Sequence, residues 1–158
     1  MSSRTVVYLT PEGFQALEKE LAFLTTVRRE EVAARLHNAL SEGEFIENAE
    51  LEEARREQAF LEGRILELEE QLRKAEIISK TEDNDGIVRL GDTVLVREDG
   101  AETDEEYLMV GSAEADPRKG RISNESPLGR ALMGRHVGEK AVVRAPDGDI
   151  VFKIISNS

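Results

Sequence analysis

The sequence contains no cysteine and no tryptophan, and aromatic residues make up only 4% of it. The absence of cysteine excludes disulfide bonds and thiolate metal sites. The shortage of aromatic residues argues against a stacking platform for single-stranded nucleic acid. Basic residues are in the minority too, with 21 lysines and arginines against 33 aspartates and glutamates and a net charge of −12. Because nucleic-acid-binding proteins usually present a basic surface to phosphates, a basic protein partner or a cation fits this chain better.

Long apolar runs and the usual catalytic motifs are also missing. No segment has the apolar length of a signal peptide or of a membrane span, which predicts a cytoplasmic protein without membrane contact. The sequence has no Gly-x-Ser-x-Gly motif and no phosphate-binding loop, and its two histidines, His37 and His136, lie far apart. We therefore do not expect the chain to be an enzyme on its own.

Two long helical patterns fill the first half of the chain. No proline interrupts them, since none occurs between Pro11 and Pro117. Thr10 and Pro11 suit the start of a helix, and the phase of its apolar residues changes after Val27, which predicts a stutter or a bend. The second pattern has the spacing of a coiled-coil seam, with Gln58 as its one polar position, which we expect to help fix the register. Its members are Leu51, Ala54, Gln58, Leu61, Ile65, Leu68, Leu72 and Ala75. Two such helices predict an antiparallel hairpin with arms about 45 Å long.

The second half changes to the alternating pattern of strands, after a polar, turn-rich segment that reads as a linker. A short helix is expected from Pro127, with Ser126 as its N-cap. The fold class is therefore α+β, with a helical hairpin at 1–78, a linker at 79–86 and a compact α+β domain at 87–158. The expected strands are Thr93–Arg97, Glu106–Val110, Gly120–Ser123, Lys140–Ala145 and Ile150–Ile155.

The segment 42–50 between the helical patterns carries four glutamates around Gly43. A glycine permits a tight chain reversal, so these acids are expected at the far tip of the hairpin. Glu44 and Glu47 are three residues apart and would share one helix face, where two carboxylates could help to hold Mg²⁺. Two carboxylates alone bind Mg²⁺ weakly, so another macromolecule would complete the site. The alternative is that the acids are solvated and complement the dipole of the second helix.

Over nearly its whole length the sequence resembles the GreA/GreB family of bacterial transcript-cleavage factors, and it is closest to GreA. The order and spacing of the matching segments carry the resemblance more than any one of them. The matching segments are 9–13 (Leu-Thr-Pro-Glu-Gly), 43–50 (Gly-Glu-Phe-Ile-Glu-Asn-Ala-Glu), 62–65 (Glu-Gly-Arg-Ile), 116–117 (Asp-Pro), 122–132 (Ile-Ser-Asn-Glu-Ser-Pro-Leu-Gly-Arg-Ala-Leu) and 137–139 (Val-Gly-Glu).

The resemblance implies a transcription elongation factor that acts through RNA polymerase. An FKBP-like C-terminal domain would bind the polymerase, and the coiled-coil hairpin would enter the secondary channel. The hairpin tip would then stimulate the polymerase's intrinsic Mg²⁺-dependent cleavage of backtracked RNA and rescue arrested complexes. By the same resemblance, the factor is a monomer that binds no cofactor alone, holds Mg²⁺ jointly with the polymerase active site, and meets the 3′ end of the nascent RNA within the complex.

Residue by residue, the resemblance assigns roles at the tip and in the C-terminal domain. Glu44 and Glu47 fall on the two catalytic, metal-binding acids of the family. Asn48 and Arg55 fall on positions near the RNA. The three polymerase-binding positions are Ser123, Glu125 and Pro127.

The chain departs from the family's pattern around the tip. Glu44 replaces an aspartate, Leu51 replaces an aromatic residue, and Leu40 stands where a basic residue is common. These departures leave open a second interpretation, a non-cleaving homologue that occupies the secondary channel and inhibits or modulates transcription. A coiled-coil adaptor unrelated to transcription is the third.

Overall fold

The computed structural model describes residues 5–42, 48–79 and 85–158, and its chain divides into two compact units. One unit, Phe14–Lys74, is helical, and the other joins the residues up to Gly13 with Ala75–Ser158. The residues up to Gly13 belong to the second unit because they pack against it, although they precede the helical unit in the chain. The domain boundaries predicted along the chain, with a linker at 79–86, remain predictions.

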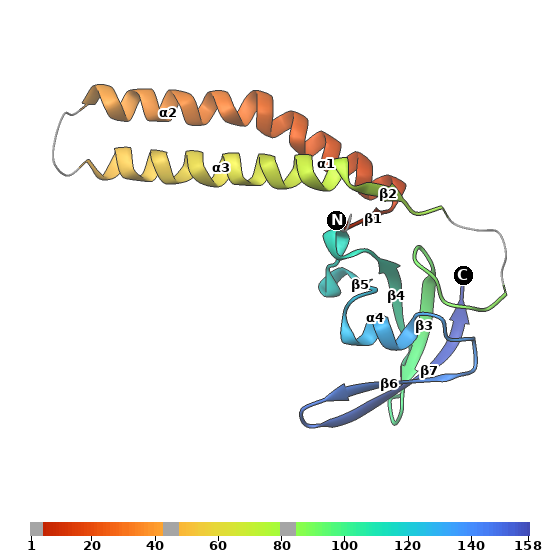
Figure 1. The fold of residues 1–158 in the computed structure, drawn as a ribbon. Coiled ribbons are helices and arrows are strands. Elements are labelled where there is room, and N and C mark those ends of the chain that lie inside the picture. Colours follow the sequence, from red (N-terminus) through yellow and green to blue (C-terminus); the bar gives the residue numbers. More distant parts are fainter. Residues whose placement is uncertain (1–4, 43–47, 80–84) are drawn as a thin grey trace. The chain divides into compact units, whose positions relative to one another are not determined.

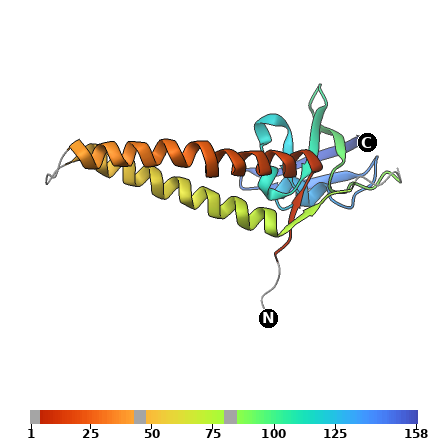
Figure 2. The ribbon, with the colours of Figure 1, turned by 90° about the horizontal axis from the view of Figure 1, so that it is seen from above.

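The helical unit is an antiparallel pair of helices, which confirms the predicted hairpin. The first arm consists of α1 (Pro11–Phe23), the π-helical η1 (Leu24–Arg28) and α2 (Arg29–Glu42). The second arm is one continuous helix, α3 (Ala49–Arg73), and α2 and α3 lie side by side in both views (Figures 1 and 2). Their apolar seam is built from Val32, Leu61 and Ile65, which pack together with the half-buried Leu21 and Leu24.

The π-helical segment η1 lies where the sequence predicted an irregularity in the first helix. A π-helical turn changes the rotation of the residues that follow, which suits the change of apolar phase after Val27. Two threonines add side-chain hydrogen bonds at this point: the Thr25 hydroxyl donates to the Leu21 carbonyl at 2.8 Å and the Thr26 hydroxyl to the Ala22 carbonyl at 2.6 Å. The predicted irregularity is confirmed.

Two expectations about the second helix are wrong. Gln58 is exposed and cannot fix the register of the seam, because the half-buried polar residue on the inner face is its neighbour Glu57. The helix also ends at Arg73, so Ala75 is not its last seam residue. Instead Ala75 begins β2 (Ala75–Ile77), which pairs in parallel with β1 (Val7–Leu9). A β-branched isoleucine in this segment favours the strand.

The second unit contains a mixed five-stranded sheet, which confirms the α+β class. Its strand order is β5-β4-β3-β7-β6, and all neighbours are antiparallel except β4 and β5. The short helix α4 (Pro127–Leu132) packs against β5 and β6, and Leu132 joins the buried core with Val94, Met109 and Ile154. The strands are β3 (Thr93–Glu98), β4 (Glu105–Val110), β5 (Arg121–Ser123), β6 (Lys140–Ala145) and β7 (Gly148–Asn157), with 3₁₀ turns η2 (Ser112–Glu114) and η3 (Pro117–Lys119). Each predicted strand is present.

Within the described ranges, none of the helices is both long and apolar enough to cross a lipid bilayer.

Candidate functional site

Asn48 links the two helices of the hairpin beside the predicted tip. Its side-chain carbonyl accepts a hydrogen bond from the Leu51 amide at 3.1 Å, which caps α3. Its side-chain amide donates to the Ala39 carbonyl of α2 at 2.9 Å. One residue therefore caps one helix and ties it to the other. Glu44 and Glu47 lie outside the described residues, so the predicted tip acids remain predictions.

The other residues assigned near the tip lie on the two helices. Arg55 is exposed on α3, and the proximity of Arg55 and Asn48 to RNA remains a prediction. Leu40 is exposed on α2, with 53% of its surface accessible, whereas Leu51 is half-buried. Among the described residues, no group of three or more histidine, aspartate and glutamate side chains is placed to hold a metal ion.

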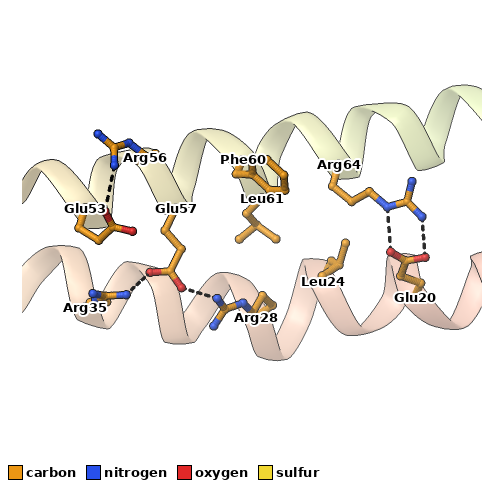
Figure 3. A pocket seen from close by; sticks show the side chains of 10 residues that line it. All are labelled: Glu20, Leu24, Arg28, Arg35, Glu53, Arg56, Glu57, Phe60, Leu61 and Arg64. Atoms are coloured by element: carbon orange, nitrogen blue, oxygen red, sulfur yellow. Dashed lines mark hydrogen bonds and ion pairs between the residues drawn. The ribbon is translucent and has the colours of Figure 1, made fainter.

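A groove of about 540 Å³ runs along the hairpin between α3 and the first arm (Figure 3). Its apolar floor includes Leu24 and the buried Leu61, while Phe60 stands above them with 82% of its surface exposed. Charged side chains form the walls. The full lining is Glu20, Leu24, Arg28, Arg35, Glu53, Arg56, Glu57, Phe60, Leu61 and Arg64.

The charges of this groove pair across the two helices. Glu57 of α3 accepts hydrogen bonds from Arg28 of η1 and Arg35 of α2, one on each carboxylate oxygen (Figure 3). Farther from the tip, Arg64 donates two hydrogen bonds to Glu20, at 2.8 and 2.9 Å. Single exposed ion pairs stabilise little. A carboxylate shared by two arginines of the other arm is held more firmly, and it fixes the position of one helix along the other. These contacts are not among the features predicted from the sequence, although charged residues beside an apolar seam are their usual signal.

The environment of Glu57 changes its ionisation. Burial raises the pKa of its carboxyl, but the hydrogen bonds from Arg28 and Arg35 outweigh burial, so the pKa lies below its ordinary value. In an unfolded chain the pKa of a glutamate is about 4.3. The stabilisation that Glu57 contributes is therefore complete above that pH and is lost as the pH falls through the lower pKa of the folded protein.

We expect the Glu57→Gln substitution to flatten the acid sensitivity of the hairpin. The wild-type hairpin should lose stability as the pH falls below about 5, and the variant should lose less, because glutamine does not titrate. Thermal unfolding followed by far-ultraviolet circular dichroism, which reports helix content, checks this. Glu18→Gln, an exposed residue of α1, serves as control and should follow the wild type. An equal loss in Glu57→Gln and wild type would contradict the role of Glu57.

The three predicted polymerase-binding residues lie in the segment 123–127, here called the 123–127 loop, which runs from the last residue of β5 to the first residue of α4. Ser123 is buried at the end of β5, whereas Glu125 and Pro127 are exposed. The Ser126 hydroxyl caps α4 by accepting from the Gly129 amide at 3.0 Å, and it donates to the Ser123 carbonyl at 2.7 Å. The 123–127 loop thus has a fixed backbone that presents Glu125 and Pro127 to solvent.

Comparisons with known proteins match nearly the whole chain. Residues 7–77 match the family model "Transcription elongation factor, N-terminal", and residues 82–157 match "Transcription elongation factor, GreA/GreB, C-term". The chain is 46% identical over 155 residues to transcription elongation factor GreA of Acetivibrio thermocellus, with 98% of each chain covered. It is also 46% identical over 156 residues to GreA of Bacillus cytotoxicus, with 99% of each covered. Among solved structures, GreA factor homolog 1 of Thermus thermophilus is 28% identical with a TM-score of 0.45, over 98% of this chain and 99% of that one.

Proposed function

Because the chain belongs to the GreA/GreB family of transcription elongation factors, we propose that it binds RNA polymerase and stimulates the polymerase's own cleavage of backtracked RNA. The 123–127 loop binds the polymerase. The factor acts as a monomer. Its hairpin enters the secondary channel and brings the tip to the 3′ end of the nascent RNA. Cleavage then frees arrested complexes, and the catalytic machinery belongs to the polymerase.

One observation carries this proposal furthest: the segment with Glu44 and Glu47 joins two helices that are tied together along their length. Asn48 links α3 to Ala39 of α2 beside this segment, and Glu57 and Glu20 link the arms farther along. A paired, cross-linked hairpin is stiffer than a single helix. Two carboxylates on such a support can be brought to a distant site with little loss of orientation, which is what a positioned reaction requires.

The donor chemistry at the tip fits Mg²⁺, since carboxylate oxygens are ligands that this ion accepts in proteins. Glu44 and Glu47 would hold the ion jointly with the polymerase active site. When bound there, Mg²⁺ neutralises charge on the phosphodiester and lowers the pKa of a water molecule. The chain's own contribution would be two metal ligands and their position, with Asn48 and Arg55 near the RNA.

A second function is favoured by one feature, the glutamate at position 44 where the family has aspartate. The longer side chain moves the carboxylate by about one bond length, and a misplacement of about 1 Å can cost on the order of 100-fold in a positioned reaction. A protein with a detuned tip would still occupy the secondary channel. It would then slow transcription and compete with active cleavage factors.

The Glu44→Asp substitution separates the two functions. If the wild-type chain stimulates cleavage, as we propose, Glu44→Asp should change the rate by less than about tenfold, because the tip already accepts the longer acid. The rate of release of short 3′ RNA fragments from purified backtracked complexes, at saturating factor, checks this. A wild-type chain that binds but does not cleave, together with an Asp variant that does, would favour the inhibitory function instead.

A further inference from the structure

The side chain of Glu125 is held in place by a residue outside its loop, Ser112 of the 3₁₀ turn η2. The Ser112 hydroxyl donates a hydrogen bond to Oε2 of Glu125 at 2.7 Å. It also lies 3.0 Å from the Ser123 hydroxyl, and the Ser123 hydroxyl accepts from the Glu125 amide at 3.0 Å. A hydroxyl has one proton to donate. Since Ser112 donates to Glu125, Ser123 must donate to Ser112.

The three contacts therefore close a ring: Ser123 donates to Ser112, Ser112 donates to the Glu125 carboxylate, and the Glu125 amide donates to Ser123. Each hydroxyl in this ring both donates and accepts, and a hydrogen bond to a carboxylate is stronger than one between neutral groups. The Glu125 side chain is otherwise exposed and would sample several rotamers in solution. The ring selects one of them before any partner arrives.

The 3₁₀ turn η2, which begins with Ser112, is held in place through its last residue, Glu114. Glu114 of η2 accepts hydrogen bonds from the Thr10 amide at 2.7 Å and from the Thr10 hydroxyl at 2.6 Å. The Thr10 hydroxyl in turn accepts from the Gly13 amide at 3.0 Å, which caps α1. Just before the turn, Gly111 packs against the Tyr8 carbonyl so closely that an added Cβ would lie 2.2 Å from the oxygen. Ser112 therefore stands on a turn held by β1 and the first turn of α1.

We infer that Ser112 is a positioning residue for polymerase binding: it pre-orients the Glu125 carboxylate of the 123–127 loop for a complementary donor on the polymerase. This inference rests on the proposed function, which assigns the loop to polymerase binding. Pre-orientation raises affinity because the cost of immobilising a side chain on binding is met in advance. Ser112 acts through Glu125, and it has no part in the chemistry at the hairpin tip.

A double-mutant cycle with the full-length chain tests this inference. The variants are Ser112→Ala, Glu125→Ala, the double variant, and Ser112→Thr, which keeps a hydroxyl at this exposed position. Ser156→Ala, an exposed serine of β7 in the same unit, is the matched control. The dissociation constant for RNA polymerase and the maximal rate of RNA cleavage at saturating factor are measured for each. Circular dichroism melts check that each variant is folded.

We expect Ser112→Ala to weaken polymerase binding by up to about tenfold, the cost of ordering one long side chain. Ser112→Thr and Ser156→Ala should bind like the wild type, and the maximal cleavage rate should not change. The double variant should bind no more weakly than Glu125→Ala alone, because Ser112 has nothing left to position.

Two results would overturn the inference and leave the proposed function intact. The first is wild-type affinity in Ser112→Ala while Glu125→Ala binds weakly. The second is additive losses in the double variant, which would place Ser112 in direct contact with the polymerase. Wild-type affinity in Glu125→Ala would instead remove the loop from the binding surface, and the proposed docking site would fail together with the inference.

Discussion

Replacing Glu47 with alanine is expected to reduce stimulated RNA cleavage on the order of 100-fold or more, while the affinity for RNA polymerase stays unchanged. Glu44→Ala should have the same effect. Each substitution removes one of two carboxylates that the proposed function assigns to Mg²⁺ at the polymerase active site. A single remaining carboxylate cannot hold the ion in the same position. Binding should persist, because the 123–127 loop, which the proposed function assigns to polymerase binding, lies in the other unit.

The matched control is Glu50→Ala, which removes the same charge three residues after Glu47. Glu50 is exposed and lies 3.7 Å from Arg35, a surface pair of little energetic weight. Cleavage by this variant should stay within about twofold of the wild type. Fragment release from backtracked complexes and polymerase affinity are measured side by side for all the variants. Normal cleavage by both Glu44→Ala and Glu47→Ala would remove these residues from the site.

The second large effect is expected at Gly129, inside α4. A Cβ at this position would lie 1.8 Å from the Ser123 carbonyl oxygen and 2.8 Å from its carbon, so backbone must move against backbone. Gly129→Ala should destabilise the sheet unit by at least about 2 kcal/mol and lower its melting temperature by roughly 10 °C or more. Since Ser123 begins the 123–127 loop, the same clash should also weaken polymerase binding.

Gly63→Ala is the control of opposite sign. Gly63 is exposed within α3, and an added Cβ would meet nothing within 4 Å. Alanine should therefore stabilise this helix by about 0.5–1 kcal/mol through its higher helix propensity. Thermal melts of both variants, with hydrogen exchange of β5 and α4 to localise the change, check the prediction. Equal stability of Gly129→Ala and the wild type would mean that Ser123 can move away at no cost.

Much of the fold could be predicted from local patterns. The two helices, the phase change near Val27 and the strands of the sheet follow from periodicity, because one face of each element is buried. The sequence could not place β2, because its partner β1 lies far along the chain and the helical spacing runs on into Ala75. Gln58 was misplaced because seam spacing alone ignores the arginines that draw Glu57 inward.

The candidate site divides in the same way. Motif resemblance grouped Ser123, Glu125 and Pro127, and the structure places them in one loop. The motif resemblance did not indicate Ser112 or Glu114, whose hydrogen bonds join parts of the chain 13 and 104 residues apart. Hydrogen bonds between such distant residues depend on how the sheet and turns pack, and no local pattern records them.

The central claim is that this chain makes RNA polymerase cut backtracked RNA. The most direct measurement is the release of short fragments from purified backtracked complexes that carry RNA labelled at its 3′ end, with Mg²⁺ present and the wild-type chain added at saturation. We expect rapid release of labelled fragments and renewed elongation when nucleotides are supplied. Confirmed binding of the chain to the polymerase with no release above the rate without the chain would contradict this claim.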